Sequence, residues 1–282
     1  MGRRTEAEKK IYQTGTSGWR ILTWGMLFVS AMLIFSGVIG HMDPPYDLTV
    51  IPSLTPQPTA VSSHFDETPD SRQITVGLKG WHGIQLGIFT SLEAAQSQAE
   101  SFRARGAAGF LWQDGQRWRV LAAVYEDKQD ADAVREQLRD TQQIDSYIFS
   151  NEPREATLAL TGLKGQLDLV EACFQCIGGM PWEIQKMSLR LDRQETDARE
   201  IAQVLEGLEN RLNELLLLLK ERFINPGHSM ILQMTSLLEK WRQSVHELAA
   251  GQESLALLAG KIKYVGIEMM HSGQEFFEFL LK

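Results

Sequence analysis

The side chains best suited to recognising a ligand lie at alternate positions of two short apolar segments, residues 83–90 and 117–125. Aromatic rings stack on the C–H faces of sugars, while Gln and Arg form hydrogen bonds with hydroxyl and amide groups. One sheet face carrying them is a candidate glycan platform. The alternative is a half-solvated face whose aromatic residues only reflect β propensity. The residues predicted to share this face are Gln85, Gly87, Phe89, Arg119, Leu121 and Tyr125.

Other reactive residue types give no catalytic pattern. Cys173 and Cys176 form a CxxC on a helical segment, without a second pair or a matching His motif, so we expect a core position rather than a metal or redox site. The histidines have no ligand spacing, and no nucleophile elbow, P-loop or dinucleotide fingerprint occurs. We therefore expect no metal, no cofactor and no enzymatic activity.

The charge balance argues against nucleic acid as a partner. The chain has 28 Lys+Arg against 36 Asp+Glu, a net charge of −8, whereas nucleic-acid binders present basic stripes. With two cysteines in the whole chain, no disulfide framework is expected.

Residues 74–151 predict a small α/β domain that would position the candidate face. Two strand–helix units repeat at one offset, which aligns Gly87 with Ala123 and Phe89 with Tyr125. Alternating strands and capped helices give the order β-α-β-β-α-β, with helices on one face of a four-stranded antiparallel sheet and the other face open. The predicted strands are residues 83–90, 108–112, 117–125 and 146–150, with helices at about 91–106 and 127–140.

The run Gln85-Leu86-Gly87-Ile88-Phe89, followed by an Ala-rich helix and then Trp118-Arg119-Val120, resembles the SPOR (sporulation-related repeat) domain over residues 80–151. The resemblance implies an exported, membrane-tethered protein that binds septal peptidoglycan whose glycan strands have lost their stem peptides. It also implies ligand contacts from the open face, which by motif are Gln85, Phe89, Arg119 and Tyr125.

The third strand departs from the family pattern. The family usually has a polar residue, then Gly and often Pro before the last aromatic residue, where this chain has Leu121, Ala123 and Val124. A less polar strand leaves an alternative open, in which the domain is vestigial or binds protein.

The N-terminal part predicts a membrane anchor and a spacer. Residues 19–41 are apolar enough for a transmembrane helix, and the basic residues before them place a tail, 1–18, in the cytoplasm. The alternative is a signal peptide cleaved near residues 38–40. Residues 42–73 are rich in Pro, Ser and Thr, which predicts an extended linker that gives reach, or a loop without a spacing role.

Residues 155–282 predict an all-α antiparallel coiled-coil bundle. Apolar residues recur every three or four positions from Leu158 onward, with breaks at residues 178–181 and 225–227 that define three helices. Gln194 and Gln252 interrupt the apolar series. The segment 276–281 is expected either to close the bundle or to dock on a partner or the membrane surface.

Together these features predict a non-enzymatic, single-pass cell-membrane protein. Its extracytoplasmic part would bind peptidoglycan in cell division or sporulation, and its bundle would bind a protein partner or self-associate. The alternative is a coiled-coil envelope scaffold.

Overall fold

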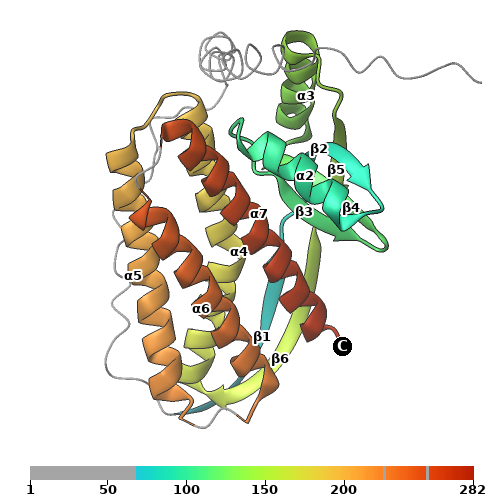
Figure 1. The fold of residues 1–282 in the computed structure, drawn as a ribbon. Coiled ribbons are helices and arrows are strands. Elements are labelled where there is room, and N and C mark those ends of the chain that lie inside the picture. Colours follow the sequence, from blue (N-terminus) through green and yellow to red (C-terminus); the bar gives the residue numbers. More distant parts are fainter. Residues whose placement is uncertain (1–67, 225–226, 252–253) are drawn as a thin grey trace, which may run out of the picture.

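The computed structural model describes residues 68–282 apart from 225–226 and 252–253 (Figure 1). The expected tail, the membrane helix 19–41 and most of the linker lie outside the described residues. Within the described part of the chain, no helix has the length and apolar character that a bilayer span requires.

The α/β domain predicted from the sequence is confirmed in its layout. Its four strands form one antiparallel sheet in the order β3-β4-β2-β5. Ser91 and Asp127 accept hydrogen bonds from the first turns of the two helices, which sets where those helices begin. The elements are β2 (Trp81–Phe89), α2 (Leu92–Arg103), β3 (Phe110–Asp114), β4 (Arg117–Tyr125), α3 (Lys128–Gln142) and β5 (Tyr147–Asn151).

The pairing of β2 with β4 shifts register twice, between Ile84 and Gln85 and again between Gln85 and Gly87. Each shift is a local irregularity that changes which side chains share a face. We call the face packed against α2 and α3 the inner face, and the opposite face the outer face. Strict alternation along β2 and β4 therefore does not assign residues to these two faces.

A two-stranded ribbon flanks this domain in the sequence. β1 (Pro69–Leu78) pairs antiparallel with β6 (Arg154–Leu163) along their whole length. β1 begins inside the segment expected as linker, and β6 occupies residues expected as helix, so both of those predictions are wrong there. Alternate apolar side chains explain the strands, because Ile74 and Val76 pack in one cluster with Ala156, Leu158 and Leu160.

The C-terminal part is all-α, as predicted, but contains four described helices in place of three. They are α4 (Lys164–Asp192), α5 (Ala198–Arg222), α6 (Ser229–Ala250) and α7 (Leu255–Leu280). The helices run antiparallel to their neighbours in the sequence around one apolar core (Figure 1). Phe276 belongs to that core and Phe277 to the cluster under the ribbon, so the terminal aromatic residues close the bundle.

The expected break at residues 178–181 is wrong, because α4 continues through Pro181. Ile177, Met180 and Ile184 are all buried in the bundle core, and this packing holds the helix together despite the missing proline N–H. The chain reverses instead after Asp192, where Gln194 has a φ of 56°.

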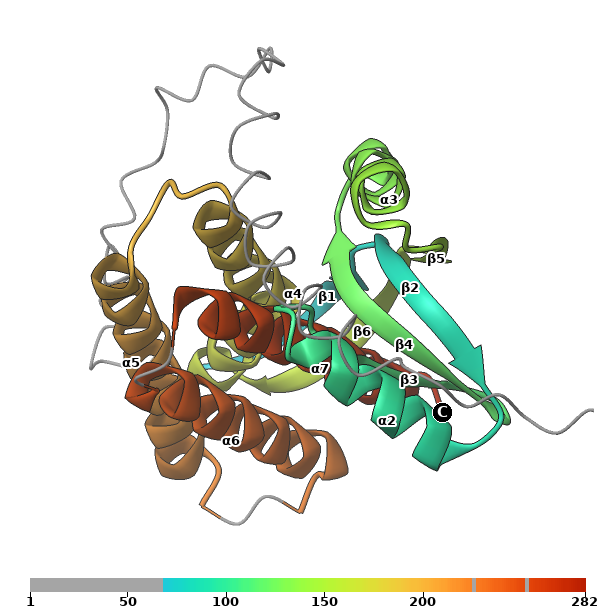
Figure 2. The same ribbon diagram turned by 45° about the horizontal axis from the view of Figure 1, so that its top comes forward.

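α7 is the element that joins the two parts of the molecule. It packs against α4 and α6 on one side and against β3 and β4 on the other (Figure 2). The sheet is therefore placed directly on the bundle and is not held away from it by a free linker.

Candidate ligand-binding face of the sheet

The outer face divides into an open polar part and a covered aromatic part. Strand pairing puts Gln85 opposite both Leu121 and Tyr147, and Trp112 opposite Arg119. Residues opposite one another in a ladder point to the same side of a sheet. Of the residues predicted for the site, Gln85, Arg119 and Leu121 thus share the outer face.

The open part, which we call the polar cluster, consists of Gln85, Asp114 and Arg119. Arg119 Nη1 donates a hydrogen bond to Gln85 Oε1 at 2.5 Å, and Arg119 Nε donates to Asp114 Oδ2 at 3.0 Å. The Arg119 guanidinium also lies 4.5 Å from the ring centroid of Phe149. Gln85 is only 4% exposed. Its charge-assisted hydrogen bond with Arg119 holds its side chain in one orientation.

Two apolar side chains extend this open part to solvent. Tyr147 is 66% exposed and Ile88 is 42% exposed. Tyr147 lies opposite Gln85 on the neighbouring strand and so presents a ring beside the polar cluster. Sequence reasoning predicted the strand of Tyr147 but did not assign its faces; the alternation of Tyr147 and Phe149 along that strand was the available signal.

The covered part, which we call the aromatic cluster, consists of Trp81, Phe110, Trp112 and Phe149. The ring of Trp81 lies edge-on to those of Trp112 and Phe149, with centroids 5.0 and 5.5 Å apart. Ile267 and Met270 of α7, with Trp182 of α4, pack in the same cluster. Leu121 is fully buried here, so it lies on the outer face without being accessible.

Phe89 and Tyr125 do not lie on the outer face, and the prediction that placed them there is wrong. Phe89 packs against the cluster of Ala95, Ala99 and Val120 under α2. Tyr125 packs under α3, where burial is the main cause that raises the pKa of its hydroxyl. The register shifts in β2–β4 are the physical reason, since they reverse the alternation on which the prediction depended.

The remaining predicted residue, Gly87, lies between the two groups. It pairs with Val120, and a Cβ at Gly87 would stand 2.8 Å from the Phe89 ring. A side chain here would therefore displace Phe89 on the inner side, which explains the need for glycine without any role in ligand contact.

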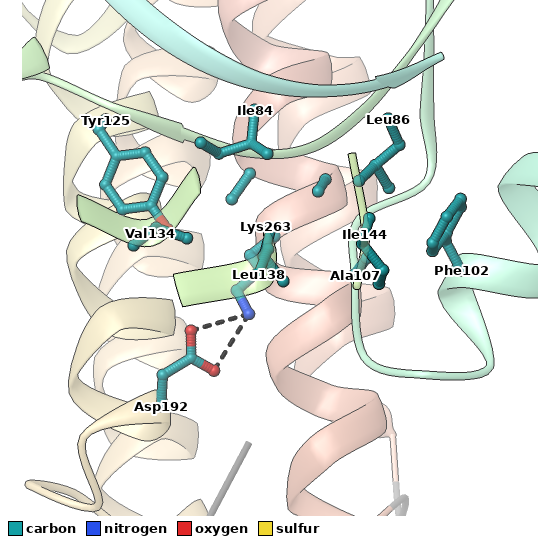
Figure 3. Close-up of a pocket in the computed structure, with 12 residues that line it drawn as sticks. Ile84, Leu86, Phe102, Ala107, Tyr125, Val134, Leu138, Ile144, Asp192 and Lys263 are labelled. Carbon is teal, nitrogen blue, oxygen red and sulfur yellow. Dashed lines mark hydrogen bonds and ion pairs between the residues drawn. The ribbon is translucent and has the colours of Figure 1, made fainter. Parts of the chain in front are cut away.

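The inner face has a cavity between α2, α3 and the sheet (Figure 3). The cavity is small and partly open, with a volume of about 50 Å³, and its lining is apolar except at one end. At that end Lys263 Nζ lies 2.8 Å from Asp192 Oδ2 and 3.0 Å from Oδ1. This buried ion pair joins α7 to the end of α4 and contacts the α/β domain on the side that faces the bundle.

The two cysteines occupy the positions predicted for them. Cys173 and Cys176 are free thiols buried in the bundle core. Burial raises the pKa of the Cys176 thiol to about 11, so the unreactive thiol form predominates at neutral pH. Among the described residues, no group of His, Cys, Asp and Glu side chains has the geometry of a metal site.

Comparison with known proteins gives one match. No curated protein and no solved structure matches the chain significantly. Residues 76–150 match the family model of the SPOR domain, in agreement with the sheet and two helices seen there. This part of the chain is a SPOR domain.

Proposed function

We propose that the protein is a non-enzymatic binding protein for the glycan strands of peptidoglycan. The observation that carries this proposal is a SPOR domain whose outer face keeps a partly exposed arginine, Arg119, held by Gln85 and Asp114 beside the exposed Tyr147. SPOR domains bind peptidoglycan, which makes glycan the first ligand to test.

The open part of the face suits a polymer of N-acetylated sugars. Tyr147 offers an exposed ring for stacking on a sugar C–H face. Arg119 is held in one orientation by Asp114 and Gln85, so its remaining N–H groups would donate to an acetamido or hydroxyl oxygen without first being ordered. A preorganised donor of this kind supports recognition of neutral glycan even though the whole chain is acidic.

We extend the proposal to the location of the protein. Residues 19–41 would anchor it in the cell membrane by a single pass, with residues 1–18 cytoplasmic and the rest extracytoplasmic. Glycan strands that have lost their stem peptides, which concentrate at division or sporulation septa, would be the preferred ligand. The linker before β1 would set how far the SPOR domain reaches from the bilayer.

A scaffold is the second candidate function, and one observation favours it. α7 and Trp182 already occupy the aromatic cluster, so part of the outer face contacts protein in this structure. In this reading the SPOR domain is a vestigial or protein-binding part of an envelope scaffold. The bundle would then supply self-association or a partner surface.

Sedimentation with purified peptidoglycan sacculi tests the first candidate. We expect the full 282-residue chain, in mild detergent, to sediment more with sacculi whose stem peptides an amidase has removed than with intact sacculi. Arg119→Ala should reduce this binding by about tenfold, the size of one charged hydrogen-bonding contact. Arg139→Ala is the matched control, because Arg139 is an exposed arginine of α3, the helix that covers the opposite face of the sheet.

Either of two results would reject glycan binding. One is equal sedimentation of wild type and Arg119→Ala, and the other is no sedimentation with either preparation. The scaffold candidate predicts that septal localisation survives Arg119→Ala in cells but is lost when residues 164–282 are deleted.

A further inference from the structure

The strongest unexplained feature of the structure is that the aromatic cluster is covered by the protein's own C-terminal helix. Tyr264 of α7 lies against Phe110, with ring centroids 5.2 Å apart. His271 of α7 lies edge-on to Trp112 at 4.6 Å. A sheet face that exposed these rings would be a large apolar patch, and such patches mark binding surfaces.

The covered rings and the open polar cluster form one continuous surface. Arg119 lies over Phe149, and Phe149 lies 5.9 Å from Trp112. A ligand seated on Arg119 and Tyr147 would therefore meet the edge of α7 as soon as it extended along the sheet. The polar cluster and the aromatic cluster are thus neighbouring parts of one side of the sheet.

Residues 81–151 are connected to the rest of the chain at two adjacent points. β1 ends at Leu78 and β2 begins at Trp81, while β5 ends at Asn151 and β6 begins at Arg154. The two connections touch, since a Cβ at Gly80 would stand 2.8 Å from the Pro153 ring. Two short connections that lie side by side are a place where a hinge could act, because few backbone dihedrals would have to change for the sheet to move away from α7.

The contact between the SPOR domain and α7 also contains polar groups that gain from water. Lys263 is 3% exposed, is paired with Asp192, and has its Nζ 3.5 Å from the carbonyl oxygen of Gly106. Burying an ion pair costs desolvation free energy, which is recovered when the two surfaces separate. This recovered free energy offsets part of the cost of exposing apolar surface when the SPOR domain separates from α7.

We propose that α7 is an autoinhibitory cover, and that the SPOR domain swings on the hinge beside Gly80 and Pro153 to expose the aromatic cluster to glycan. The inference rests on the proposed function, because it concerns regulation of the same site. A glycan that binds only the uncovered face shifts the molecule toward the open arrangement. The closed arrangement keeps the protein from holding glycan that offers only a short contact.

A wedge at Gly260 tests the cover without altering the site. Gly260 lies on α7, and a Cβ there would stand 3.2 Å from the backbone of Gly106 and Ala107. Gly260→Leu therefore places its side chain between the bundle and the SPOR domain. Gly207→Leu is the matched control, because a Cβ at Gly207 on α5 meets nothing within 4 Å.

A crosslink between the SPOR domain and α7 tests the opposite case, in which the aromatic cluster cannot be uncovered. Asn151 Nδ2 donates a hydrogen bond to Gln274 Oε1 at 3.0 Å, which joins β5 to α7. The variant Asn151→Cys with Gln274→Cys, joined by a short thiol crosslinker, locks the closed arrangement. Cys173 and Cys176 are buried and do not compete. Acrylamide quenching of tryptophan fluorescence reports opening, because Trp81 and Trp112 gain exposure.

With denuded sacculi and the full chain, we expect Gly260→Leu to raise both quenching and binding, the latter by about tenfold. Gly207→Leu should match wild type, and the crosslinked variant should bind less than the same variant before crosslinking. The cover is refuted if wild type binds but neither the wedge nor the lock changes binding. Absence of binding in every variant, the opened one included, instead rejects the proposed function itself.

Discussion

Arg119 Nη1 donates to Gln85 Oε1 at 2.5 Å, across the neighbouring strands β4 and β2. The same guanidinium holds Asp114, so one cation orders two side chains of the outer face. Arg119→Lys cannot make both contacts, because an ammonium lacks the planar fork of guanidinium. We expect Arg119→Lys to bind denuded sacculi nearly as weakly as Arg119→Ala in sedimentation assays. Full binding by the lysine variant would show that charge alone, without orientation, is sufficient.

Tyr147 and Phe89 should respond oppositely to substitution. Tyr147 is 66% exposed on the outer face, so Tyr147→Ala should lower glycan binding several-fold while changing the free energy of unfolding by less than about 0.5 kcal/mol. Phe89 packs on the inner face, so Phe89→Leu should leave glycan binding unchanged. Binding isotherms beside urea unfolding of each variant make the comparison. Loss of binding with Phe89→Leu at unchanged stability would contradict the assignment of faces.

Glycines in the bundle give a test of the continuous helix α4. Gly179 lies inside it, and a Cβ there meets only Glu183 Oε1, at 3.9 Å. Gly179→Ala should therefore raise the free energy of unfolding by roughly 0.5–1 kcal/mol. Gly266→Ala should lower it, because its Cβ would stand 2.5 Å from Gln185 Nε2 and displace the bond from that amide to the Lys263 carbonyl. A helix broken at residues 178–181 would show no gain from Gly179→Ala.

Removing one partner of the buried ion pair Lys263–Asp192 should lower the free energy of unfolding more than replacing both partners. Lys263→Met leaves the Asp192 carboxylate without its cation, with an expected loss of about 3–5 kcal/mol in the free energy of unfolding. Adding Asp192→Leu to Lys263→Met should restore most of that loss. Denaturant unfolding of the two single variants and the double variant measures this coupling, and additive losses would argue against it.

The buried thiols predict a loss of stability in alkali. Burial raises the pKa of Cys176 from 9.0 to about 11, with Cys173 shifted in the same direction. The stabilisation is fully present below about pH 9 and is lost as the pH rises toward 11, because the unfolded chain ionises first. Urea unfolding at pH 8 and pH 10.5 should show this decline, and Cys176→Val should reduce it. If Cys176→Val loses as much stability between pH 8 and pH 10.5 as wild type does, groups other than Cys176 cause the decline.

The sequence predicted the SPOR domain well because local signals agree there. The alternation in residues 83–90 and the caps Ser91 and Asp127 each correspond to an observed element. Alternation could not predict which side chains lie on which face of the sheet. The two register shifts between β2 and β4 have no recognisable signature in the amino-acid sequence. The prediction for Phe89 and Tyr125 failed for this reason, while Gln85 and Arg119 lie on the outer face as expected.

Long-range packing accounts for the other differences. Pro181 is a strong helix breaker by itself, yet its neighbours Ile177 and Ile184 are buried in the bundle, and the helix continues. β6 forms because it pairs with β1, which begins in residues expected as linker. Apolar residues alternate in β6, but the sequence does not show which strand it pairs with. The cover over Trp112 depends on α7, which is distant in the sequence from β3, so it too became visible only in the structure.

The ribbon has a mechanical consequence. Pro69 pairs with Leu163 at one end of the ribbon, and Leu78 pairs with Arg154 at the other, beside the SPOR domain. A chain tethered before β1 and holding a fixed polymer through its sheet would carry tension along the backbone of β1. That tension would not have to pass through α4 to α7. The bundle would thus stay outside the loaded path and could keep its fold, and any partner, while the two attachment points move apart.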